Sequence, residues 1–229
     1  DVLVTGYDII FFWVIRMMML GLYVTKKPPF KKIYLHGLVR DKDRQKMSKS
    51  KGNVIDPMEI TEKYGTDALR LALIIGNMPG KDVVISEEKI KGYRNFVNKI
   101  WNVFRFILIN TEDYKPGKII LTKEDKQILK NFEKKSLSIT KKIDNFKFSQ
   151  AAEETYHYTW HEFADKIIEK SKPVLEDKKT RKSRQYVLIE VMKGITILLH
   201  PFAPFVTEKI YQNLPIKKKS SLMIESWPK

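Results

Sequence analysis

The stretch Val2-Leu3-Val4-Thr5-Gly6-Tyr7-Asp8 opens the pattern that decides the fold of the first part of the chain. Residues 2–4 form a short apolar run that predicts a buried strand. The almost continuously apolar residues 9–23 predict a helix that Asp8 caps, and residues 33–39 predict a second strand. Strand, long helix and strand in this order are typical of a parallel, doubly wound sheet.

The helix expected over residues 9–23 is apolar enough to raise the question of a membrane. Its length of about 16 residues is shorter than the roughly 20 that a bilayer span needs. Arg16 would also place a charge at mid-depth. We therefore expect a helix buried between the sheet and a neighbouring domain, and no membrane partner.

Polar clusters follow both predicted strands, where parallel sheets bind their ligands. Gly6 and Gly37 would let the backbone approach a flat ring or a ribose, because a Cβ atom would block that approach. Asp8 could accept hydrogen bonds from ribose hydroxyls or simply cap its helix. His36 could contact a ligand or be a structural histidine. The residues alone favour the structural alternative for both Asp8 and His36.

The loop Lys46-Met47-Ser48-Lys49-Ser50 comes after the second predicted strand. Lysine ammonium groups, hydroxyls and backbone amides are suited to following charge along a polyphosphate. Composition alone favours a solvated surface turn, since Lys and Ser are ordinary loop residues.

The exact string of this loop resembles the signature of class I aminoacyl-tRNA synthetases. Its continuation, Lys51-Gly52-Asn53-Val54-Ile55-Asp56-Pro57, is similar to the subgroup that handles valine, isoleucine and leucine. The upstream run from Asp1 to Val14 most closely resembles the valyl enzymes. The resemblance extends along essentially the whole chain.

This resemblance implies roles for individual residues. Gly6 and Asp8 would contact the adenylate ribose, and the cluster that cradles adenine would be His36, Gly37 and Leu38. In the signature loop, the Met47 backbone would approach adenine, with Ser48 among the nucleotide contacts. Lys46 and Lys49 would serve the phosphates as catalytic residues. Trp13, which on its own suggests a core residue, would line the amino-acid pocket.

The resemblance also implies a reaction. The carboxylate of valine would attack the α-phosphate of ATP, which is bound with Mg²⁺, and pyrophosphate would leave. The aminoacyl group would then pass to the terminal ribose of tRNA(Val). This chemistry needs positioning and electrostatic stabilisation rather than a side-chain nucleophile. We therefore expect valine, ATP and tRNA(Val) as partners, and no DNA.

Charge and cysteine content agree with these expectations. The formal net charge is +16, of which residues 1–80 carry +5 and the rest +11, so the second part has most of the basic excess. Such an excess suits a polyanionic nucleic acid, although a solvated lysine-rich face explains it equally well. The chain has no cysteine, which excludes disulfides and thiolate zinc sites. We expect a cytoplasmic location.

A Pro-Gly break at residues 78–82 separates this α/β pattern from a wholly helical one. We predict two domains: residues 1–80, the C-terminal part of a Rossmann-like nucleotide-binding fold, and residues 81–229, an α-helical bundle that the resemblance identifies as anticodon-binding. Before the break, short helices are expected over residues 57–64 and 68–77, the second capped by Thr66 or Asp67.

Four features mark the helices expected after the break. Ser86 caps the first, whose apolar side chains recur at steps of three and four. Thr122 caps a second helix to about residue 144, and a third begins near Ser149. The basic run 178–184 opens a fourth and could meet phosphate or simply be solvated.

Lys99 and Phe106 lie seven residues apart on the first of these helices, off its main apolar stripe. A cation beside an aromatic ring suits an unstacked RNA base, so both are candidate tRNA contacts. Packing of Phe106 against a neighbouring helix is the simpler explanation. His157 and His161 have the spacing of metal ligands but lack a third partner, and we expect no metal site.

The resemblance also suggests that the chain is a fragment, because the first half of the nucleotide-binding fold is not in it. The alternatives to a piece of a valyl enzyme are a piece of an isoleucyl enzyme and a non-catalytic, basic RNA-binding module.

Overall fold

The computed structural model describes residues 1–48, 50, 52–216 and 219–228. The chain forms two compact units, the first made of Asp1–Asp56 with Gly76–Glu87 and the second of Pro57–Ile75 with Glu88–Lys229. Compactness therefore groups the helices around residues 57–75 with the helical unit. The division after residue 80 remains a prediction about domains.

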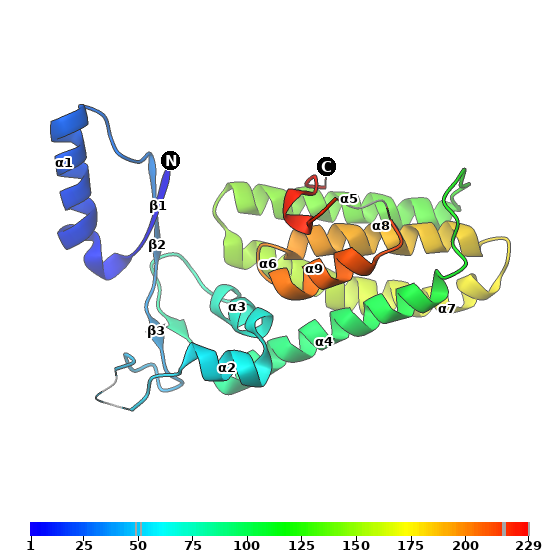
Figure 1. The fold of residues 1–229 in the computed structure, drawn as a ribbon, viewed down its shortest axis with the longest axis horizontal. Coiled ribbons are helices and arrows are strands. Elements are labelled where there is room, and N and C mark those ends of the chain that lie inside the picture. Colours follow the sequence, from blue (N-terminus) through cyan, green and yellow to red (C-terminus); the bar gives the residue numbers. More distant parts are fainter. Residues whose placement is uncertain (49, 51, 217–218, 229) are drawn as a thin grey trace. The chain divides into compact units, whose positions relative to one another are not determined.

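The first unit contains two short parallel sheets (Figure 1). β1 (Val2–Gly6) pairs with β2 (Lys32–His36), and β3 (Val39–Arg40) pairs with β4 (Val83–Val84). The single strand expected over residues 33–39 is thus interrupted at residues 37–38. Strand pairing changes there from β1 to the segment after residue 80.

The apolar segment after β1 is helical but irregular. It begins as a 3₁₀ turn over Tyr7–Ile9, continues as a π-helical turn over Ile10–Val14, and becomes an α-helix, α1, over Ile15–Thr25. The expectation of a buried helix was wrong, since Val14 is the only buried side chain in these three elements. Two short strands are too small to cover a helix on all sides. In the described part of the chain, Tyr7–Thr25 is the one helix long and apolar enough to cross a membrane.

The second unit is built from helices (Figure 1). They are α2 (Pro57–Tyr64), α3 (Thr66–Ile74), α4 (Glu87–Asn110, whose first residue belongs to the other unit), α5 (Lys123–Asp144), α6 (Phe148–His157), a π-helical segment (Tyr158–Ile168), α7 (Glu169–Glu176), α8 (Arg181–Leu199), α9 (Pro204–Asn213) and a 3₁₀ turn (Leu222–Ile224).

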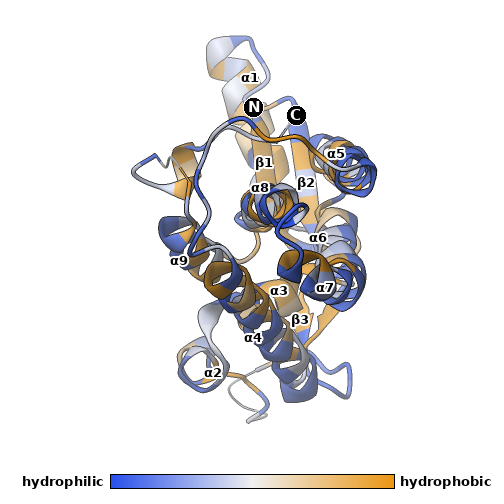
Figure 2. Cartoon of the chain, turned by 90° about the vertical axis from the view of Figure 1, so that its right-hand side faces the viewer, coloured by the Kyte–Doolittle hydropathy of each residue, from blue (hydrophilic) through white to orange (hydrophobic). Residues whose placement is uncertain are grey.

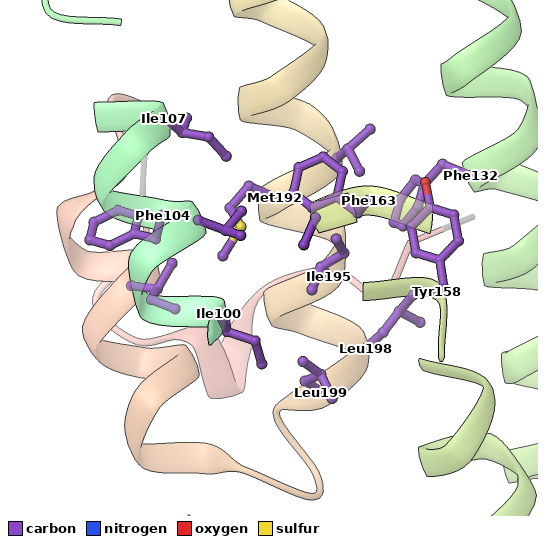
Figure 3. Packing of buried hydrophobic residues seen from close by; sticks show 14 of the residues in the cluster. Ile100, Phe104, Ile107, Phe132, Tyr158, Phe163, Met192, Ile195, Leu198 and Leu199 are labelled. Atoms are coloured by element: carbon purple, nitrogen blue, oxygen red, sulfur yellow. The ribbon is translucent and has the colours of Figure 1, made fainter. Parts of the chain in front are cut away.

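Helix α8 forms the centre of this bundle and contacts α5, α6, α7 and α9. Its Met192, Ile195, Leu198 and Leu199 are buried (Figure 3). In the same core, α4 contributes Ile100, Phe104 and Ile107, the stripe that the sequence predicted. By contrast, the ribbon of α5 is mainly hydrophilic in Figure 2, which agrees with a helix that buries only one face.

Two of the predicted helix caps lie in the helical unit and are tested there, and one is confirmed while the other is wrong. Thr122 caps α5, since its Oγ1 accepts the amide of Asp125 at 3.1 Å. Asp67 does not cap α3, which begins after Gly65 without a side-chain cap. Its carboxylate instead accepts the amides of Phe205 (3.2 Å) and Val206 (2.7 Å) at the start of α9.

Two arginines of the basic run 178–184 are structural. Arg184 is 1% exposed and its Nε donates to Asp125 Oδ1 at 2.5 Å. Arg181 donates through Nε and Nη2 to the carboxylate of Asp113. Neither of the two alternatives left open for this run, phosphate contact or solvation, describes these arginines, because each side chain satisfies a carboxylate of its own unit.

Candidate nucleotide site and signature loop

The ends of β1 and β2 bring three predicted residues together. Gly6 and His36 are register partners at the carboxyl ends of the two strands. A Cβ atom on Gly6 would lie 2.6 Å from Asp8 Oδ1 and 3.6 Å from His36 Cε1. Asp8 is exposed and makes no capping hydrogen bond, so the expected cap was wrong and its carboxylate faces solvent beside Gly6. This edge of the sheet therefore presents the Asp8 carboxylate as a hydrogen-bond acceptor, the His36 imidazole and, at Gly6, a backbone position without a side chain.

Gly37 is required by packing. A Cβ atom there would lie 1.8 Å from the carbonyl oxygen of Lys81, a distance that real structures do not allow. His36 Nδ1 lies 2.9 Å from the Gly37 carbonyl oxygen. The space expected for a ligand ring at Gly37 is therefore taken by the chain itself, while the space at Gly6 is limited only by two side chains.

Asp82 is the residue of this site that the sequence did not reveal. Its Oδ1 accepts the Leu38 amide and the Tyr7 hydroxyl, each at 2.9 Å, and its Oδ2 pairs with Arg40 Nε. The bond from the Leu38 amide and then the pairing with Arg40 hold the pKa of Asp82 below its usual range. The only sequence signal was its place as the last residue of the Pro-Gly break 78–82, and that break was interpreted as a domain boundary.

The base of the signature loop is closed by Asp41 and Asn53. Asp41 Oδ1 accepts the Gln45 amide at 2.8 Å, and Asn53 Nδ2 donates to Asp41 Oδ2 at 2.7 Å. Asn53 also accepts the Ser48 amide at 2.9 Å and donates to the Lys46 carbonyl at 3.3 Å. These bonds fix the backbone around the loop while leaving the Lys46 side chain exposed.

The structure describes only some of the remaining predicted site residues. Ser48 Oγ lies 3.1 Å from Ser50 Oγ, and Met47 is half-buried. Lys49 lies outside the described residues. Trp13, in the π-helical turn, is 44% exposed.

Lys99 and Phe106 lie in different surroundings of the helical unit. Lys99 Nζ donates to Asp165 Oδ1 at 2.9 Å and lies 5.6 Å from the centre of the Trp160 ring. Phe106 is half-buried at the edge of the core. It lines an open groove of about 1010 Å³ whose other side chains are Asn110, Asp113, Lys115, Lys172, Leu175, Glu176, Lys178, Arg181, Lys182 and Gln185.

Two family descriptions match the two parts of the sequence. Residues 1–86 match "tRNA synthetases class I (I, L, M and V)", and residues 125–229 match "Anticodon-binding domain of tRNA ligase". The chain belongs to the class I aminoacyl-tRNA synthetases. The helical bundle of this synthetase chain therefore contains its anticodon-binding domain, and the α/β part belongs to the Rossmann-like catalytic fold.

The similar curated synthetases are valine–tRNA ligases. The one from Bacillus cereus strain ATCC 10987 is 47% identical over all of this chain, which covers 26% of that protein. The Pelagibacter ubique ligase is 46% identical over all of the chain and 27% of its own length. The chain thus spans about a quarter of the length of the curated relatives that it matches.

Solved synthetase structures share the fold. The LeuRS–tRNA–LeuAMS ternary complex of Agrobacterium radiobacter K84 has a TM-score of 0.83 and 21% identity, over 100% of this chain and 28% of that one. The Mycobacterium tuberculosis methionyl-tRNA synthetase in complex with methionyl-adenylate has a TM-score of 0.76 and 23% identity, over 92% of this chain and 43% of that one.

Proposed function

We propose that this chain is part of a valine–tRNA ligase that activates valine with ATP and transfers it to tRNA(Val). The observation that supports the proposal most strongly is the identity of 43–49% to valine–tRNA ligases over essentially the whole chain. It favours valine over isoleucine, and a synthetase over a non-catalytic RNA-binding module. We also propose a cytoplasmic location.

The geometry of the first unit supports the nucleotide half of this proposal. Gly6 has no side chain to obstruct a ribose, and the Asp8 carboxylate beside it can accept hydroxyl hydrogen bonds. His36, opposite Gly6, offers a flat ring at the same edge. These residues would orient the nucleoside, which is the positioning that adenylate formation requires.

The signature loop would act on the phosphates. Lys46 is exposed on a backbone that Asn53 and Asp41 hold, so its ammonium group can reach a ligand without disturbing the loop base. Lys49 is proposed as the second phosphate-binding lysine on its sequence position alone. Mg²⁺ would arrive as part of the ATP complex and neutralise phosphate charge, and the two lysines would add donors as charge spreads to the leaving pyrophosphate.

The groove beside Phe106 supports tRNA as the partner of the helical unit. Lys115, Lys178 and Lys182 are exposed on its walls, and Phe106 supplies an aromatic surface. A cationic groove with one aromatic side chain suits single-stranded RNA, whose bases stack while its phosphates pair with lysine.

A chimaera tests the enzymatic proposal. The matched region of the Bacillus cereus valine–tRNA ligase is replaced by this chain, and valine-dependent ATP–pyrophosphate exchange is measured. We expect exchange with valine, much less with isoleucine, and a large loss in Lys49→Ala. Lys27→Ala, a charge-matched change remote in sequence from the loop, should behave like the unsubstituted chimaera. Absence of exchange in a folded chimaera would contradict the proposal.

A further inference from the structure

Asp82 lies where three separate segments of the first unit meet. Tyr7 belongs to the turn after β1, Leu38 follows β2, and Arg40 ends β3. All three donate a hydrogen bond to the one carboxylate, and the Asp82 side chain is only 18% exposed. One side chain thus joins segments that are 42 to 75 residues distant from it in sequence.

Each of the three donors is directly attached to a predicted nucleotide-binding element. Tyr7 lies between Gly6 and Asp8, so its hydroxyl anchors the turn that carries the ribose-side carboxylate. Leu38 is the last residue of the adenine-side cluster, and Asp82 fixes its backbone amide. The Arg40 backbone pairs with Lys46, and its Nη1 donates to the Arg44 carbonyl at 3.2 Å, which links Asp82 to the signature loop.

The position of Asp82 itself does not depend on these three bonds. The strand that follows it is held by backbone hydrogen bonds, from Val83 to the Leu38 carbonyl at 2.8 Å and from Ile85 to the Arg40 carbonyl at 3.0 Å. On its other side the Gly80 amide donates to the Leu35 carbonyl at 2.9 Å. The backbone therefore presents the carboxylate at a fixed place, and removing its charge should leave this pairing intact.

We infer that Asp82 is a positioning residue for ATP. It fixes the relative positions of three segments: the turn at Gly6, Tyr7 and Asp8, the cluster of His36, Gly37 and Leu38, and the signature loop. Three donors converging on one ionised carboxylate provide strong, charge-assisted hydrogen bonds in a mostly enclosed place. This inference rests on the proposed function for its ligand, while the coupling of the three segments rests on the geometry alone.

The first test is made on the chain itself and needs no activity. Hydrogen–deuterium exchange is compared between the unsubstituted chain, Asp82→Asn and the matched surface change Asp144→Asn. In Asp82→Asn we expect faster exchange in the peptides around Tyr7 and over residues 38–48, with the Val83 and Ile85 amides still protected. Unchanged exchange around Tyr7 and the loop would overturn the coupling. Loss of protection at Val83 and Ile85 as well would make Asp82 a merely structural residue.

The second test, made in the chimaera, compares the effect of Asp82→Asn on the KM for ATP with its effect on the KM for valine. In Asp82→Asn we expect the KM for ATP to rise, or kcat to fall, by about tenfold, with the KM for valine unchanged. Tyr7→Phe should give a smaller effect in the same direction, since two of the three donors remain. The inference would be overturned if Asp82→Asn left both kcat and the KM for ATP unaltered, or if it raised the KM values for ATP and valine equally. An inactive unsubstituted chimaera would instead count against the proposed function, and the exchange experiment would still decide the coupling.

Discussion

The Asp67 carboxylate accepts the backbone amide of Val206 at 2.7 Å, so a residue in the first turn of α3 caps the start of α9. Arg70, one turn further along α3, donates to the carbonyls of Pro201 (3.0 Å) and Phe202 (3.2 Å) in the turn before α9. Helix α3 therefore binds backbone amides at the start of α9 and backbone carbonyls in the turn before it.

Asp67→Ala tests this contact. The variant removes the cap of α9 and so leaves two amides of its first turn without their acceptor. We expect the free energy of unfolding in urea to fall by about 1–2 kcal/mol. Glu59→Ala, at an exposed position in α2, should change it by less than about 0.5 kcal/mol. An equal, small effect of both changes would contradict the capping role.

The buried pair of Arg184 and Asp125 should be sensitive to losing one partner. Both side chains are at most 1% exposed, and Arg184 also donates to Ser171 Oγ at 3.0 Å. Asp125→Ala would leave a buried guanidinium without its main partner, so we expect a loss of about 3–5 kcal/mol in unfolding free energy. In a double-mutant cycle, the variant that combines Asp125→Leu with Arg184→Met should lose much less unfolding free energy than the sum of the losses in Asp125→Leu alone and Arg184→Met alone.

Two glycines predict opposite effects of the same substitution. Gly37→Ala would place a Cβ atom 1.8 Å from the Lys81 carbonyl oxygen, and we expect it to destabilise the chain by about 3 kcal/mol or more. Gly92→Ala adds a methyl group to open space on α4, so it should stabilise the chain by roughly 0.5–1 kcal/mol. Thermal unfolding of both variants checks the prediction, and a neutral Gly37→Ala would show that the two backbones can separate at no cost.

The Asp113 carboxylate should make the free energy of unfolding decrease in acid. Hydrogen bonds from Arg181, and then from Gln185, lower the pKa of Asp113 from 3.8 to about 2. Because the unfolded chain binds this proton more tightly, the stabilisation is complete above about pH 4 and is lost as the pH falls towards 2. Solvent screening limits its size, since the Asp113 side chain is 59% exposed.

The measurement for Asp113 is urea unfolding between pH 2 and pH 6. Asp113→Asn should flatten the pH dependence relative to the unsubstituted chain. Asp144→Asn, a matched change of an exposed carboxylate at the end of α5, should retain the original slope. Equal slopes in all three proteins would contradict the assigned pairing.

The proposed role of the groove beside Phe106 in binding tRNA(Val) predicts two distinguishable effects. Phe106→Ala should weaken binding by about tenfold at every salt concentration, because a stacking surface is lost. Lys178→Ala should reduce the slope of log K against log salt by about one, because one phosphate contact is lost. Lys99→Ala should change the slope less, since its ammonium group is bound to Asp165. A salt titration with labelled tRNA measures all three, and unchanged binding in Phe106→Ala would exclude it from the interface.

The amino-acid sequence by itself determined the order of the main helices, the cap at Thr122 and the buried stripe of α4. It also determined the family, through motifs that are contiguous in the chain. Each of these rests on residues within a few positions of one another, so periodicity, capping and motif spacing are sufficient to predict them.

Only the tertiary structure decided the roles of Asp67, Asp82 and Arg184. Asp67 was one of two expected caps of its own helix, and Arg184 was expected to meet phosphate or solvent, yet each binds a partner elsewhere in the bundle. The partners lie 139 residues away for Asp67 and 59 for Arg184, while Asp82 meets Leu38 across 44 residues. Local patterns cannot specify such partners, because a polar group is satisfied by whichever donor or acceptor the packing of distant segments brings to it.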